Sequence, residues 1–166
     1  SMILDEIVEN TRLVVERAKQ LKPQSLLEAE IINVGQTRGF AAALKVSGRI
    51  RIISELKKAS PSGGLIRPDF VPEQIAEMYE QHGAAAVSIL TDEKYFQGQL
   101  GYIDRVKAVI GLPALRKDFM IEPYQFYEAR AAGADCILLI VRILSDEQIR
   151  DFLSLTKELG MDALVE

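Results

Sequence analysis

Short apolar runs alternate along the chain with longer segments in which apolar residues recur every three or four positions. The runs are bounded by glycine or proline and lack polar alternation, which is typical of strands buried on both faces. We expect five strands, at residues 51–56, 84–90, 114–119, 135–141 and 163–166. The amphipathic segments between them predict helices at 69–83, 100–110, 123–132 and 145–160. This alternation of strand and helix predicts a parallel sheet covered by helices.

Two helical segments precede the first expected strand. Residues 3–21 carry apolar side chains on one side of a helix, which Lys22 and Pro23 close. Ser25, with Glu28 three residues later, has the spacing of a capping box and predicts a second helix. The last long helix has the same signal in Ser145 and Gln148.

Two architectures fit the alternating pattern. One is a (β/α)8 barrel, and the other is an open, doubly wound sheet of about five strands. Neither a glycine-rich dinucleotide motif nor a phosphate-binding Walker loop occurs in the sequence, which disfavours the nucleotide-binding forms of the open sheet.

Composition narrows the class of protein further. The 166 residues are 48% hydrophobic and 27% charged, with a net charge of -4 and no block rich in lysine and arginine, so we expect no nucleic-acid partner. The single cysteine, Cys136, implies no disulfide framework and suits a reducing cytoplasm.

The sequence also predicts no metal site, because it has one histidine and no cluster of ligand residues. No signal peptide or long apolar span is evident, so we expect a cytoplasmic protein without a membrane partner.

Ionisable residues gather at the carboxyl ends of the expected strands. Glu55 and Lys57 end the first strand, Lys117 ends the third and Glu166 ends the fifth. Parallel strands bring their carboxyl ends to the same side of a sheet, where the sites of α/β proteins form. We therefore expect these four side chains to converge over a common cavity.

Four segments together resemble the indole-3-glycerol-phosphate synthase family of tryptophan biosynthesis. They are Ser54-Glu55-Leu56-Lys57-Lys58-Ala59-Ser60-Pro61-Ser62, Ser88-Ile89-Leu90-Thr91-Asp92-Glu93-Lys94-Tyr95-Phe96, Leu115-Arg116-Lys117-Asp118-Phe119 and Leu138-Leu139-Ile140-Val141. The resemblance covers the whole chain, including the N-terminal helices. It implies a (β/α)8 barrel enzyme, a carboxy-lyase that closes the ring of 1-(2-carboxyphenylamino)-1-deoxyribulose 5-phosphate and then releases carbon dioxide and water. It implies no metal and no organic cofactor.

The resemblance also implies roles for individual residues. Lys117 matches the acid that protonates the ketone oxygen, and Lys57 matches the lysine that holds the anthranilate carboxylate. Glu166 matches the carboxylate that assists dehydration, and Glu55 the one that orients the substrate and the lysines. Substrate-binding positions are implied for a phosphate contact and for the apolar walls of the anthranilate pocket: Ser60, Phe96, Phe119 and Leu138.

A complete barrel of this kind needs about 250 residues, and this sequence reaches only the fifth strand. We therefore expect an α/β chain that forms a partial TIM (β/α)8 barrel, with residues 1–48 as an N-terminal helical extension and 49–166 as the first to fifth strands of the barrel. Such a fragment is expected to be inactive or weakly active, and to self-associate through its exposed sheet edges.

Two alternatives stay open. Another sugar-phosphate barrel enzyme, such as a phosphoribosylanthranilate isomerase, would lack the paired Glu55 and Lys57 and the N-terminal helices. A non-catalytic, five-stranded domain of flavodoxin-like topology would have its strand order rearranged around a central first or third strand.

Overall fold

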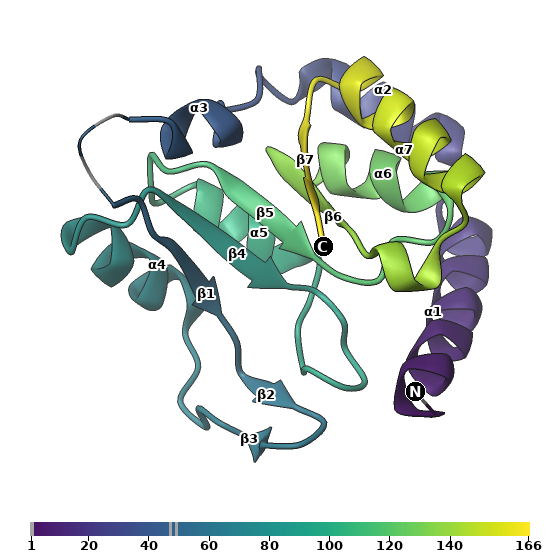
Figure 1. The fold of residues 1–166 in the computed structure, drawn as a ribbon, viewed down its shortest axis with the longest axis horizontal. Helices are drawn as coiled ribbons and strands as arrows, with labels where there is room; N and C mark the ends of the chain where they lie inside the picture. Colours follow the sequence, from purple (N-terminus) through teal and green to yellow (C-terminus); the bar gives the residue numbers. More distant parts are fainter. Residues whose placement is uncertain (1, 47, 49) are drawn as a thin grey trace.

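A five-stranded parallel sheet forms the centre of the computed structural model, which describes residues 2–46, 48 and 50–166 (Figure 1). Its strands are β1 (Ile53–Leu56), β4 (Ala86–Leu90), β5 (Ala114–Lys117), β6 (Cys136–Leu139) and β7 (Asp162–Val165). They lie in the order β1-β4-β5-β6-β7, and each neighbouring pair is parallel. Strand order therefore follows chain order. The rearranged order of the flavodoxin-like alternative is wrong for the described residues.

The helices between the strands follow the expected pattern, with ends shifted by a few residues. They are α4 (Pro72–Gln81), α5 (Gly101–Lys107), α6 (Pro123–Ala131) and α7 (Asp146–Glu158). The fourth expected strand is shorter than 135–141, because Val141–Ile143 forms a single 3-10 turn, η1. Glycines with positive φ close several of the helices; Gly133 and Gly160 adopt φ of 98° and 78°, which favour glycine after a helix.

Each face of the sheet packs against a different apolar cluster. Side chains such as Val87 and Ile137 meet α4 to α7 in the main core. The residues that alternate with them, such as Leu115 and Leu138, face the other way and pack against Phe40. Because side chains alternate along a strand, Glu55 and Lys117 lie on the same face as this second cluster.

Three N-terminal helices precede the sheet: α1 (Met2–Leu21), α2 (Gln24–Asn33) and α3 (Phe40–Leu44). Buried Val15 and Leu27, from α1 and α2, pack against Tyr124 of α6. The Tyr124 hydroxyl donates a 2.6 Å hydrogen bond to the Lys22 carbonyl, and Lys19 forms a 2.5 Å ion pair with Glu122. These contacts fix the carboxyl end of α1 against α6.

The two expected capping boxes have different outcomes. The one at Ser145 and Gln148 is confirmed, since each residue's side chain accepts a hydrogen bond from the other's backbone N–H. The one at Ser25 is wrong, because α2 begins at Gln24 after Pro23 and has no side-chain cap. Proline has a fixed φ suited to the entry of a helix, so this helix begins without a capping hydroxyl.

The expected boundary between the helical extension and the barrel, between residues 48 and 49, falls at Arg49, which lies outside the described residues.

A hairpin follows β1, in a segment for which the sequence predicted neither a helix nor a strand. β2 (Ala59–Ser60) and β3 (Gly64–Leu65) pair antiparallel, and Figure 1 shows them at the bottom of the view, away from the main sheet. Strands of two residues are too short to show an alternating pattern in the sequence.

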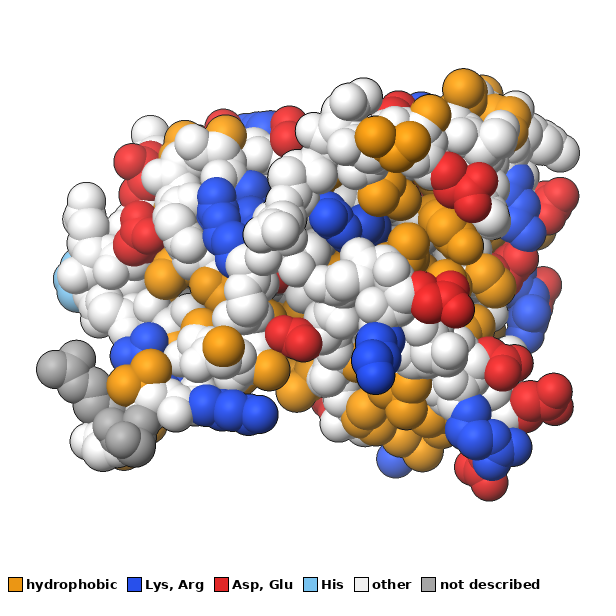
Figure 2. Space-filling view, turned by 90° about the horizontal axis from the view of Figure 1, so that it is seen from above, with side chains coloured by type: hydrophobic (Ala, Val, Ile, Leu, Met, Phe, Trp, Pro, Cys, Tyr) orange, Lys and Arg blue, Asp and Glu red, His pale blue; other side chains and the backbone are white. Residues whose placement is uncertain are grey.

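Acidic and basic side chains are intermingled over the face of the molecule drawn in Figure 2. Hydrophobic side chains gather in smaller groups between them. In the described part of the chain, no helix combines the length and the apolar character needed to span a membrane.

Candidate active site

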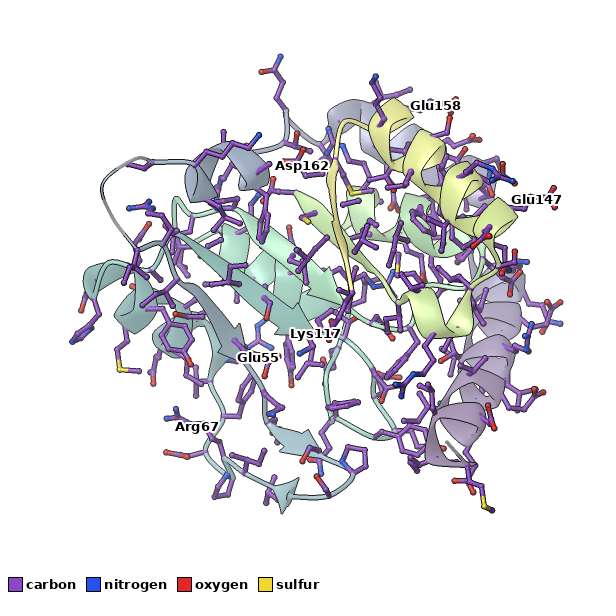
Figure 3. The ribbon with its side chains drawn as sticks, viewed as in Figure 1. Glu55, Arg67, Lys117, Glu147, Glu158 and Asp162 are labelled. Atoms are coloured by element: carbon purple, nitrogen blue, oxygen red, sulfur yellow. The ribbon has the colours of Figure 1, made fainter. Side chains whose placement is uncertain are left out.

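Glu55 lies between two lysines at the carboxyl ends of the strands. The Lys117 ammonium group donates a hydrogen bond to Glu55 Oε1, and Lys57 Nζ lies 3.5 Å from Glu55 Oε2. Figure 3 shows Glu55 and Lys117 pointing toward one another, from β1 and β5, across the face of the sheet. The structure thus brings together three of the four charged residues that the sequence selected.

A cavity of about 400 Å³ lies beside this cluster, over the ends of β4, β5, β6 and β7. Most of its wall is apolar. The side chains that line it are Leu4, Leu90, Phe96, Lys117, Asp118, Phe119, Leu138, Ile140, Arg142 and Glu166. The rings of Phe96 and Phe119 lie 6.2 Å apart between centroids, tilted by 35°. An aromatic group is therefore compatible with this wall, and Lys117 joins the cavity to the charged cluster.

Glu166, the fourth predicted charge, lines the same cavity as Lys117. Its backbone N–H donates to the Leu139 carbonyl and its own carbonyl accepts from the Val141 N–H, both at 2.8 Å. These bonds place it at the end of β7, beside η1. In the described part of the chain its carboxylate forms no ion pair, unlike that of Glu55.

The predicted substrate-binding residues divide into two groups. Phe96, Phe119 and Leu138 all line the cavity. Ser60 does not; it lies in the hairpin, where its hydroxyl accepts a 2.9 Å hydrogen bond from the Gly63 N–H. The structure therefore does not bring Ser60 to the cavity.

Arg116 and Asp118, which flank Lys117, form hydrogen bonds that hold the end of β5. Arg116 is 5% exposed; it donates to the Thr91 hydroxyl at 3.0 Å and to the Gln125 carbonyl at 2.9 Å. Asp118 accepts from the Thr91 hydroxyl at 2.6 Å and from the Phe119 N–H at 2.8 Å. These bonds connect the end of β5 to the end of β4 and limit movement of the Lys117 backbone.

A further, partly buried acid lies at the edge of this network. Glu128 forms a 3.3 Å ion pair with Arg116. Burial raises the pKa of the Glu128 carboxyl, and the nearby Arg116 charge only partly opposes this shift.

Phe96 is carried by a tight loop after β4. Asp92 Oδ1 accepts hydrogen bonds from the N–H groups of Tyr95 and Phe96, at 2.7 and 3.3 Å. Gly98 closes the loop with a 2.7 Å bond from its N–H to the Asp92 carbonyl, and its Cα packs so closely on Leu90 that a Cβ would lie 2.1 Å from the Leu90 carbonyl oxygen. The loop thus fixes the direction of Phe96.

Sequence reasoning missed several residues that line the cavity, notably Leu4 and Arg142. Arg142 directly follows the expected fourth strand, 135–141, so the rule that selected Lys117 could have selected it too. Nothing in the sequence pointed to Leu4, because its approach depends on how α1 docks against the rest of the protein.

The arrangement is suited to proton transfer on a molecule that has both an aromatic and a charged part. It provides ammonium groups and carboxylates at the edge of an apolar cavity, where such groups act as acids and bases. Among the described residues, no group of three or more histidine, cysteine, aspartate or glutamate side chains is placed to hold a metal ion.

Comparison with known proteins adds a family match. A family model described as "Indole-3-glycerol phosphate synthase" matches residues 4–166. Proteins of that name from Rhodopirellula baltica and Laribacter hongkongensis are 45% and 47% identical to this chain, over 99% and 100% of it. A third, from Dechloromonas aromatica, is 47% identical over 100% of the chain. The chain spans 63% of the first relative and 64% of the other two.

Proposed function

The chain belongs to the indole-3-glycerol phosphate synthase family, and from this premise we propose that the protein closes the indole ring of 1-(2-carboxyphenylamino)-1-deoxyribulose 5-phosphate, a small phosphorylated substrate. The observation that carries the proposal is the cluster of Lys117, Glu55 and Lys57 beside an apolar cavity. An enzyme that joins an aromatic ring to a ketone needs an acid for the ketone oxygen and an apolar wall for the ring.

In the proposed reaction Lys117 is the acid. As the ring carbon that bears the carboxylate attacks the ketone carbon, the ketone oxygen takes a proton from the Lys117 ammonium group and becomes a hydroxyl. The carboxylate then leaves as carbon dioxide and returns its electron pair to the ring. Glu55, which contacts both lysines, keeps them oriented.

The final step is the loss of water. The new hydroxyl leaves as water after taking up a proton, and a proton is removed from the adjacent CH2 carbon, which lies between it and the nitrogen, so that the indole double bond forms. We assign Glu166 to this step because it lines the same cavity as Lys117. Lys57 supplies or accepts a proton here, and Ser60, on the hairpin outside this cavity, is assigned to the substrate phosphate.

We further propose that the sheet is part of a (β/α)8 barrel. Five parallel strands in chain order, with a helix after each of the first four, support it. In this proposal residues 1–48 form the helical extension and 49–166 the first five strands. The relatives are longer than this chain, so the activity proposed is that of the whole protein.

Self-association of residues 1–166 is also proposed. β1 and β7 are the edges of the sheet in the described chain, and Val165 of β7 is 50% exposed. Unpaired edges of this kind are able to pair with another copy. Sedimentation at micromolar concentration tests this, since a compact monomer would contradict it. The cytoplasmic location stays a prediction from the sequence.

Activity is tested by joining residues 1–166 to the final third of the Laribacter hongkongensis relative and following the fluorescence of the indole product. We expect turnover by the joined protein, loss of at least about 100-fold on Lys117→Ala, and no loss on Lys157→Ala, a substitution of an exposed lysine on α7. Residues 1–166 alone are expected to show little or no turnover. A joined protein that folds but yields no product would overturn the proposed function.

A further inference from the structure

Arg142 lines the cavity but has no role in the reaction as proposed so far. We propose that its guanidinium binds the carboxylate on the aromatic ring of the substrate, and so sets the orientation of that ring. This inference rests on the proposed function and deepens it, because it adds a substrate-binding residue that the family resemblance did not supply.

Backbone hydrogen bonds hold Arg142 in place. It is the middle residue of η1, which begins at Val141, two residues after the last residue of β6. The Val141 N–H donates to the Glu166 carbonyl at 2.8 Å, and the Leu144 N–H donates to the Val141 carbonyl at 3.2 Å. The turn is therefore attached to the end of β7, and the Arg142 side chain starts from a fixed point at the rim of the cavity.

Among the described residues, Arg142 differs from the two lysines in forming no ion pair with a carboxylate. Lys117 and Lys57 both contact Glu55, whose single carboxylate offsets one of their two charges. Arg142 forms no ion pair and donates no side-chain hydrogen bond to any described residue, although Glu166 lines the same cavity. An exposed arginine without a partner at the edge of an apolar cavity is free to bind an anion, and its planar guanidinium matches a carboxylate with two parallel hydrogen bonds.

The ring carboxylate is the anionic group that the geometry favours. A ring held against Phe96 and Phe119 keeps its carboxylate close by, because the group is bonded directly to the ring. The substrate phosphate is at the far end of a flexible sugar chain. Lys57, which the resemblance pairs with the carboxylate, is not among the residues that line this cavity.

The test is a titration of residues 1–166 with anthranilate, followed by ¹H–¹⁵N NMR shifts, with aniline as the matched ligand that lacks the carboxylate. Wild type is expected to bind anthranilate more tightly than aniline, with shifts around Arg142 and Phe119. Arg142→Ala should weaken anthranilate binding by about tenfold to a hundredfold, the range expected when a hydrogen bond to a charged group is lost. Arg142→Lys should restore part of it, since lysine keeps the charge without the fork.

Two further variants separate the alternatives. Arg150→Ala removes an exposed arginine of α7 that does not line the cavity, and is expected to bind like wild type. Lys57→Ala is expected to change anthranilate affinity less than Arg142→Ala. Wild-type binding that survives Arg142→Ala, or that is lost only in Lys57→Ala, would overturn this inference and leave the proposed function standing. Absence of anthranilate binding by wild type, together with an inactive joined protein, would overturn both.

Discussion

Lys117 and Glu55 are separated by 62 positions in the sequence, yet they form an ion pair across the carboxyl ends of β5 and β1, with β4 between the two strands. Their side chains are 39% and 30% exposed. An ion pair with this much access to water contributes little to stability, because solvent screens the attraction. We therefore connect the pair with the chemistry of the cavity and not with the folding of the chain.

Glu55→Gln tests this distinction. The substitution removes the charge that both lysines contact, so activity of the joined protein should fall by about 100-fold or more, as expected when an acid–base group loses its orientation. The free energy of unfolding should change by less than about 1 kcal/mol. Urea unfolding and product fluorescence measure the two effects.

A matched control for this variant is Glu73→Gln, which breaks the exposed ion pair of Glu73 with Arg105, at 2.8 Å and away from the cavity. It should change stability by a similarly small amount and leave activity intact. Unfolding of Glu55→Gln at much lower urea than the control would assign Glu55 a structural role.

Gly98→Ala should destabilise the protein strongly. The added Cβ would lie 2.1 Å from the Leu90 carbonyl oxygen, so the loop that carries Phe96 must move away from β4. Overpacking of this kind costs about 1–3 kcal/mol or more. Urea unfolding measures it, and the loss of ring contact should appear as altered shifts of Phe96 and Phe119.

Gly101→Ala serves as the comparison, because a Cβ at Gly101 has no neighbour within 4 Å. Gly101 begins α5, where alanine is the better helix former, so this variant should be neutral or gain up to about 1 kcal/mol. Equal destabilisation by both substitutions would show that the close approach at Gly98 is not the cause.

Much of the sheet could be predicted from the sequence because its strands are apolar on both faces. Ala86–Leu90 is buried at every position. A continuous apolar run of this length is typical of a parallel strand that is covered on both faces. The convergence of Lys117 with Glu55 also followed from the sequence, since parallel strands carry their ends to one side. Distances between the side chains did not follow, because they depend on the register between strands.

The rest could not be predicted because it depends on contacts between distant segments. Leu4 reaches the cavity only because α1 docks on α6 through Tyr124 and the pair of Lys19 with Glu122. The hairpin at Ser60 has strands too short to leave a pattern. Arg142 directly follows the expected fourth strand, but its place at the cavity depends on the 3-10 turn η1, which the sequence did not predict.

Cys136 should be unreactive in the folded protein. Its thiol is fully buried, and burial raises its pKa to about 12, so almost none is present as the reactive thiolate at pH 8. We expect a thiol reagent to modify it only in denaturant, or at the rate at which the protein opens. Rapid modification of native protein at pH 8 would contradict the burial of β6 between its neighbours.

Asp92→Asn should gain stability relative to wild type as the pH rises. Asp92 is 6% exposed, and burial, helped by the nearby charge of Asp118, raises its pKa above the ordinary value of 3.8. Between that value and the raised pKa the folded state keeps a proton that the unfolded state has lost. The free energy of unfolding of wild type therefore falls as the pH rises through this interval, and the loss persists above it.

Asparagine at position 92 does not titrate and still accepts hydrogen bonds from Tyr95 and Phe96. Urea unfolding from pH 3.5 to 8, a range chosen to span the shift, measures the difference. Asp92→Ala separates the two effects, since it should show the same trend with pH but a constant loss of about 1 kcal/mol for each hydrogen bond removed. A difference between Asp92→Asn and wild type that shrinks with rising pH would mean that the folded state favours the charged carboxylate, and that the loop holding Phe96 is more open to water than the structure has it.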